Sequence, residues 1–242
     1  MALNKEYHAT ERPRKFAASL VLKIFIVLLM VDSIIELSFI SSMVAWLNRT
    51  VTQNDFLFNF NGSTHVLAGV PQNLLVDQGH TSNGAAGTAF VLIGLGGIVA
   101  LLLRSVSERR TTGFGVFGRY FYYLWVVLNI PALLLSIGAL GYVFAVTNAR
   151  QGQTIDVSQA ASLNGRPYPL DSWTPQNWFS AVLQLDLVER RDEILSHLYV
   201  MRGWQYNLIP MFFIQLGETI VAVWDCFSWR QQAKRMAYNP GY

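Results

Sequence analysis

Four long apolar stretches divide the sequence, and polar segments separate them. The stretches cover residues 20–47, 85–103, 120–146 and 206–229. A helix needs about 20 apolar residues to cross a hydrocarbon layer that is about 30 Å thick. A helix also satisfies its backbone hydrogen bonds within one segment, which an open strand in lipid does not. The pattern therefore predicts an all-α, polytopic membrane protein with four transmembrane helices, organised as a single domain over residues 1–242.

The segment between the third and fourth stretches, residues 147–205, is too long for a featureless loop. Its first part, through Asn164-Gly165-Arg166-Pro167-Tyr168-Pro169, is rich in turn residues and is expected to be irregular. Thr174 can then cap a helix that begins at Pro175. Apolar residues recur after it at intervals of three or four, with one longer gap, which predicts an amphipathic outer-loop helix or a helical pair broken near Glu189. The residues of this apolar stripe are Trp178, Val182, Leu185, Val188, Leu195 and Leu198.

The apolar stripe has two interpretations. We expect the helix to pack at the outer mouth of the bundle, as a cap or as a surface for a partner. Its opposite face carries charges of both signs, whereas a helix that binds anionic lipid is typically rich in lysine. Plain anchoring at the membrane interface through Trp173, Trp178 and Trp204 is the alternative.

Basic residues gather in three of the polar segments. By the positive-inside rule these segments are cytoplasmic, so both termini face the cytoplasm, and residues 48–84 and 147–205 form the outer loops. The basic residues are Lys5, Arg12, Arg14, Lys15 and Lys23 at the first stretch, Arg104, Arg109, Arg110 and Arg119 between the second and third, and Arg230, Lys234 and Arg235 after the fourth.

Two tripeptides in the first outer loop agree with this orientation. Asn48-Arg49-Thr50 and Asn61-Gly62-Ser63 both match the acceptor pattern for N-glycosylation. Such tripeptides also arise by chance, and Asn48 lies close to the expected membrane edge. The sequence therefore predicts a glycoprotein in which Asn61 is the better acceptor.

Composition and charge narrow the class of protein. The chain is 52% hydrophobic and only 14% charged, whereas soluble domains carry about 25% charged residues. The net charge of +3 comes without a basic stripe or a base-stacking module, so no nucleic-acid partner is predicted. Cys226 is the single cysteine, which argues against claudins and tetraspanins, whose outer loops carry cysteine pairs. The lipid bilayer of a plasma membrane or endomembrane is the expected environment.

Acidic side chains interrupt two of the apolar stretches. Asp32 and Glu36 lie in the first and Glu218 lies in the last, although a charge at the centre of a bilayer costs about 3 kcal/mol or more. Asn129 and Gln215 are expected at a similar depth, so these five residues are predicted to form an intramembrane polar cluster. Their carboxyl groups are expected to be protonated, hydrogen-bonded or neutralised by a cation.

Smaller patterns add three expectations. Lys23 and Asp225 both belong to the cytoplasmic third of the bundle and are expected to pair. Gly94, Gly96 and Gly97 are expected to allow close contact between helices. Gly138, Gly141 and Ala145 are expected to do the same for the third stretch.

These patterns favour a structural or accessory role, in which the protein assembles with itself or with another membrane protein. A cation- or proton-conducting or coupling protein that uses the buried carboxyl groups is the alternative. A membrane-embedded enzyme is the third hypothesis. The sequence shows no catalytic set, and its four histidines lack the spacing of metal ligands, so no metal and no cofactor are predicted.

Overall fold

Helices dominate the computed structural model, which describes residues 3–107 and 113–238. Over these residues the chain is 75% helical and forms six continuous helical segments, so the prediction of a mainly helical protein is confirmed. Three described helices are long and apolar enough to cross a membrane: Asp77–Ser107, Gly113–Asn148 and Arg191–Gln231. Arg109 and Arg110, which belong to the second basic segment, lie outside the described residues.

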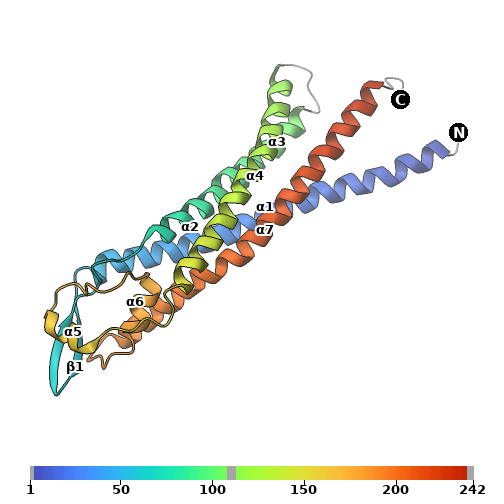
Figure 1. Ribbon diagram of the computed structural model, residues 1–242. Helices are drawn as coiled ribbons and strands as arrows, with labels where there is room; N and C mark the ends of the chain where they lie inside the picture. The colour runs from blue at the N-terminus through green and yellow to red at the C-terminus, as the bar shows by residue number, and fades with distance from the viewer. Residues whose placement is uncertain (1–2, 108–112, 239–242) are drawn as a thin grey trace. The chain divides into compact units, whose positions relative to one another are not determined.

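The elements follow the chain from blue to red in Figure 1. The first part of the chain contains α1 (Leu3–Trp46), a short π-helix η1 (Leu47–Val51), β1 (Phe56–Phe60) and β2 (Ser63–Leu67). One continuous helical stretch then consists of α2 (Asp77–Thr88), the π-helix η2 (Ala89–Leu95) and α3 (Gly96–Ser107). The remaining elements are α4 (Gly113–Asn148), α5 (Val157–Leu163), α6 (Pro175–Val182) and α7 (Arg191–Tyr238).

Contacts divide the chain into two compact units. The first unit draws on residues within Met1–Ile34, Ala85–Ile137 and Pro210–Tyr242. The second unit draws on Ile35–Gly84 and Gly138–Ile209. Helices α1, α2, α4 and α7 contribute residues to both units. Each unit is therefore discontinuous in sequence.

Glycines set the closest approaches between helices of the first unit. A Cβ atom on Gly94 would lie 2.4 Å from Cγ of Met30, and one on Gly97 would lie 2.7 Å from Cζ2 of Trp125. A Cβ atom at either position would require the Met30 or Trp125 side chain to move, which confirms close helix contact at Gly94 and Gly97. A Cβ atom on Gly96 would lie 3.5 Å from Cδ1 of Trp125, an ordinary contact distance. Trp125 also donates from Nε1 to the carbonyl oxygen of Ile93 in η2, at 3.2 Å.

The expectation for the later glycines of α4 is wrong. A Cβ atom on Gly138 or Gly141 would meet nothing within 4 Å, and Ala145 is exposed. This side of α4 therefore does not pack against the rest of the described chain. The sequence shows small residues at helical spacing, but it does not show which of them face a neighbouring helix.

A β-hairpin in the second unit was not predicted. Strands β1 and β2 pair antiparallel, with Phe56 opposite Leu67 and Phe60 opposite Ser63. Asn61 and Gly62 connect them with φ values of 49° and 77°. Both residues adopt the left-handed region that a two-residue type I′ turn requires, and Asn-Gly is the favoured pair for it. The signal was present, but the same residues also match the glycosylation pattern.

Two short helices follow α4 in the second unit. Helix α5 occupies part of the segment that was expected to be irregular, so that expectation is wrong there. Asp156 caps it by accepting from the backbone N–H groups of Ser158 and Gln159, and the hydroxyl of Ser158 lowers the pKa of the Asp156 carboxyl. Helix α6 begins where the sequence placed it: Thr174 accepts from the N–H of Asn177, and Pro175 is the first helical residue.

Aromatic side chains fill the core of the second unit. Trp173 and Trp178 are fully buried, with ring centroids 5.3 Å apart. Nε1 of Trp178 donates to the carbonyl oxygen of Gly69 at 2.9 Å. A Cβ atom on Gly69 would lie 2.0 Å from the carbonyl oxygen of Val51, so only glycine fits where the hairpin returns to the end of η1. Tyr168 completes this group, and its ring centroid lies 5.9 Å from that of Trp178.

Candidate functional site

An ion pair joins two helices of the first unit. Arg104 of α3 forms a salt bridge with Asp225 of α7, and Tyr122 of α4 donates to the same carboxylate at 2.6 Å. The Arg104 guanidinium also lies over the rings of Tyr122 and Trp229, 4.9 and 5.0 Å from their centroids. Asp225 is only 4% exposed. Three helices thus share one buried charge pair.

This pair corrects the sequence expectation for Asp225. Lys23, the expected partner, has an exposed side chain, whereas Arg104 is held against Asp225. The sequence assigned Arg104 to a basic flank because it follows the second apolar stretch. A single sequence does not reveal that an arginine at the edge of one stretch meets an acid 121 residues later.

Polar side chains also connect α4 and α7 further along the first unit. Ser136 donates to Oε1 of Gln215, and both residues are buried. Asn129 is fully buried and donates from Nδ2 to the carbonyl oxygen of Trp125 at 2.9 Å. Oδ1 of Asn129 and Nε2 of Gln215 have no hydrogen-bond partner. These two side-chain amides therefore use only part of their hydrogen-bonding capacity.

Glu218 is the most unusual side chain of the first unit. It is 0% exposed, and neither of its carboxyl oxygens has a hydrogen-bond partner. Asp32 is partly buried, and its Oδ2 also has no partner. Buried polar groups are nearly always hydrogen-bonded, so an isolated carboxyl at this depth requires an explanation.

The five residues of the predicted polar cluster fall into both units. Asp32, Asn129, Gln215 and Glu218 belong to the first unit, whereas Glu36 belongs to the second. Within the second unit, Oε2 of Glu36 accepts from Nδ2 of Asn207 at 3.0 Å, and Glu36 is fully buried. That all five residues form one cluster stays a prediction.

The residues of the apolar stripe have two different environments. Trp178, Val182, Leu185 and Leu198 are at most 5% exposed. Val188 and Leu195 are 51% and 38% exposed. Helix α6 ends at Val182 and α7 begins at Arg191, so a break separates the two helical parts of the stripe. The buried members pack inside the second unit and the exposed members lie on its surface.

The two glycosylation sequons both place an exposed asparagine in the second unit. Asn61 lies in the hairpin turn, and the neighbouring Gly62 has no atom within 4 Å of a Cβ position. Asn48 lies within η1, and its carbonyl oxygen accepts from Oγ1 of Thr52 at 2.8 Å. The turn therefore presents Asn61 with open space around it, whereas Asn48 is held in a helical segment.

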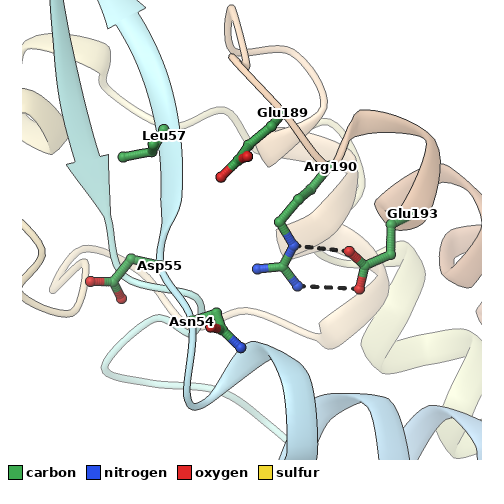
Figure 2. Close-up of a pocket in the computed structure, with 6 residues that line it drawn as sticks. All are labelled: Asn54, Asp55, Leu57, Glu189, Arg190 and Glu193. Carbon is green, nitrogen blue, oxygen red and sulfur yellow. Dashed lines mark hydrogen bonds and ion pairs between the residues drawn. The ribbon is translucent and has the colours of Figure 1, made fainter.

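The second unit also contains an open, polar pocket of about 430 Å³. Figure 2 shows the guanidinium of Arg190 paired with Glu193, with Asp55 and Glu189 elsewhere around the pocket. Arg190 donates from Nε to Oε2 of Glu193 at 2.9 Å and from Nη2 to Oε1 at 3.2 Å. The residues that line it are Asn54, Asp55, Leu57, Glu189, Arg190 and Glu193.

The Arg190–Glu193 pair is built into the fold of the second unit. Arg190 has a φ of 65°, in the left-handed region that is uncommon for residues other than glycine. Its guanidinium lies 5.2 Å from the ring centroid of Phe56. Glu193 accepts a further hydrogen bond from Nε1 of Trp46 at 2.6 Å. Sequence reasoning missed this pair, although an arginine three residues before a glutamate at a helix start is a recognisable pattern.

The pocket and the buried acids offer different chemistry. In the pocket, the one guanidinium is already paired, and Asp55 and Glu189 are exposed to solvent. Among the described residues, no group of three or more histidine, cysteine or acidic side chains is placed to hold a metal ion. Glu218 lies in the dry interior of apolar helices, where a single proton changes both its charge and its hydrogen bonding.

No protein-family model, no curated protein and no solved structure matches this chain.

Proposed function

We propose that this chain is an integral membrane protein with a structural or accessory role, which assembles with a second copy of itself or with another membrane protein. Support for a membrane location comes from the three long apolar helices. We propose that residues 20–47 of α1 form a fourth span. Their exposed side chains are large and apolar, among them Val27 at 56% and Val31 at 53% exposure. A large exposed apolar surface of this kind is favourable in lipid and unfavourable in water.

One observation carries the proposed assembly. Val188, Leu195 and Tyr199 are 51%, 38% and 62% exposed, beside a well-packed aromatic core in the second unit. Leu195 and Tyr199 are four residues apart on α7, so they lie on one face of the helix. Adjoining apolar side chains on a surface, such as Leu195 and Tyr199, are typical of protein contacts. These residues include the exposed part of the apolar stripe that the sequence singled out.

Substitutions at the exposed and buried ends of the stripe test this role. We expect Val188→Asp with Leu195→Asp to reduce assembly at least tenfold and to leave the folded yield near that of the wild type. Leu185→Asp is the contrast, because Leu185 is 5% exposed and an aspartate there buries an unpaired charge. That variant is expected to lose most of its folded yield. Assembly is measured as the mass of the full chain in mild detergent, with any copurifying protein identified.

Two results would contradict this proposal. A wild-type protein that is monomeric and copurifies with nothing would contradict the assembly role. Undiminished assembly of the Val188→Asp, Leu195→Asp variant would show that these side chains are not the contact.

The proposed orientation has both termini in the cytoplasm and the second unit on the outer side. We expect Asn61→Gln to abolish a glycan-dependent shift in electrophoretic mobility, because Asn61 is exposed in an open turn. Asn48→Gln is the matched control and is expected to change the shift little. Digestion with a glycosidase identifies the shift. An unglycosylated Asn61 in a eukaryotic host, with a protease-accessible N-terminal tag in sealed cells, would reverse the orientation.

A cation- or proton-conducting or coupling role is the second candidate. It is favoured by Glu218, whose fully buried carboxyl oxygens lack hydrogen-bond partners. Ionisable side chains inside membrane helices commonly mark ion or proton pathways.

A further inference from the structure

Two side-chain contacts fix the register of α4 against α7 in the first unit. Ser136 binds Gln215, and Tyr122 binds Asp225. Because the lower number on α4 meets the higher number on α7, the two helices run antiparallel. Asn129 lies seven residues from both Tyr122 and Ser136, which is about two helical turns, so it shares their face of α4.

Glu218 lies close to the level of Asn129 by this register. The midpoint between Gln215 and Asp225 falls at residue 220, opposite Asn129. Glu218 is two residues from this midpoint, which is about 3 Å along the helix axis. Gln215, Glu218 and Asp225 recur at intervals of three and seven residues and are all buried, so they share one face of α7.

Four buried side chains at this level have polar atoms without hydrogen-bond partners. The atoms are both carboxyl oxygens of Glu218, Oδ1 of Asn129, Nε2 of Gln215 and the hydroxyl of Thr219, the residue next to Glu218. An ionised Glu218 can only accept hydrogen bonds, so it cannot bond to Oδ1 of Asn129, which is also an acceptor. A protonated Glu218 can donate to Oδ1 of Asn129, while its carbonyl oxygen accepts from Nε2 of Gln215. One proton thus makes Glu218, Asn129 and Gln215 complementary.

The charged groups of the surrounding helices do not neutralise Glu218. Among the described side chains of the first unit, Lys23 of α1 and Arg119 of α4 are exposed, as is Arg230 of α7. Arg104 of α3 is bound to Asp225, which also holds the hydroxyl of Tyr122. Asp32 of α1 is an acid and adds no positive charge. An ionised Glu218 would therefore remain an uncompensated charge in an apolar interior.

We propose that Glu218 is a proton-binding site, and that its protonated carboxyl bridges α7 to Asn129 of α4. The proposal rests on the membrane location proposed above and assigns a proton, and not a metal cation, as the ligand in the second candidate function. Binding of the proton completes a hydrogen-bonded layer between Ser136–Gln215 on one side and Tyr122–Asp225 on the other. Loss of the proton leaves a negative charge without a basic side chain among the described side chains of the first unit to neutralise it.

Infrared spectroscopy of the full chain in lipid tests this site, because it reports protonation directly. At neutral pH the wild type is expected to show a carbonyl stretching band of a protonated carboxylic acid that Glu218→Gln lacks. Glu36→Gln is the matched control, since Glu36 is equally buried but lies in the second unit, and it is expected to retain the band. Asn129→Leu keeps the acid and removes its acceptor, so the band is expected to move to higher frequency.

Several outcomes would overturn the proposal. An unchanged acid band in Glu218→Gln would do so. A band that does not move in Asn129→Leu would remove the bridge, and this variant also serves if Glu218→Gln does not fold. Loss of the acid band when sodium is added at constant pH would identify a cation site instead. Release of the protein from membranes by an alkaline wash would contradict the membrane location separately, without altering the spectroscopic result.

Discussion

Replacing Arg104 with leucine is expected to lower the free energy of unfolding by about 3–5 kcal/mol, because it leaves the carboxylate of Asp225 buried without its cation. Asp225 is 4% exposed and retains only the hydroxyl of Tyr122 in that variant. The loss is measured as a fall in the midpoint of thermal or denaturant unfolding of the purified chain. Lys23→Leu is the control, because Lys23 is exposed, and it is expected to change the midpoint little.

A double variant distinguishes the value of the ion pair from the cost of breaking it. Arg104→Leu combined with Asp225→Leu removes both charges, and replacing a buried pair with apolar side chains is often close to neutral. We therefore expect the double variant to regain most of the stability lost by Arg104→Leu. A double variant that is as unstable as the sum of its single variants would show that the two charges act independently.

Truncation of Trp178 to alanine is expected to destabilise the second unit by about 3–5 kcal/mol, the usual cost of removing a large aromatic side chain from a core. Trp178 is 0% exposed, contacts Trp173 and Tyr168, and donates to the carbonyl oxygen of Gly69. Unfolding of the second unit is followed by proteolysis of the full chain, with the fragments identified by mass spectrometry.

Two further variants control this prediction. Trp224→Ala removes a tryptophan that is 63% exposed in the first unit and is expected to leave cleavage within residues 138–209 unchanged. Trp178→Phe keeps most of the ring and removes the hydrogen bond to Gly69, so we expect a loss of about 1–3 kcal/mol. Equal protection of the wild type and Trp178→Ala would contradict the importance of this core.

Local signals account for the parts of the fold that could be predicted from sequence. The apolar stretches predicted long helices because the helical period and the absence of charge are properties of each segment alone. The capped start of α6 followed from Thr174 and Pro175 for the same reason. The hairpin was also accessible, since Asn61-Gly62 joins two short runs rich in β-branched and aromatic residues. It was missed because the residues were interpreted only as a glycosylation pattern.

The candidate sites depended on contacts that no local pattern reveals. Arg104 and Asp225 lie 121 residues apart, and Glu36 and Asn207 lie 171 apart. The register and the rotation of whole helices determine which residues meet. A small change in the register or in the rotation of one helix replaces one partner with another. The sequence could therefore indicate that acids inside the apolar stretches require partners, but it assigned Asp225 to Lys23.

The discontinuity of the two units has a consequence for the order in which they form during synthesis. All residues of the second unit precede residue 210, whereas the first unit also needs residues within Pro210–Tyr242. Chains fold progressively as they emerge from the ribosome. The aromatic core of the second unit can therefore close while Arg104 and Tyr122 still await Asp225. Until that last segment arrives, Arg104 lacks the carboxylate that it pairs with in the folded protein. This is the interval in which a membrane chaperone could bind the first unit.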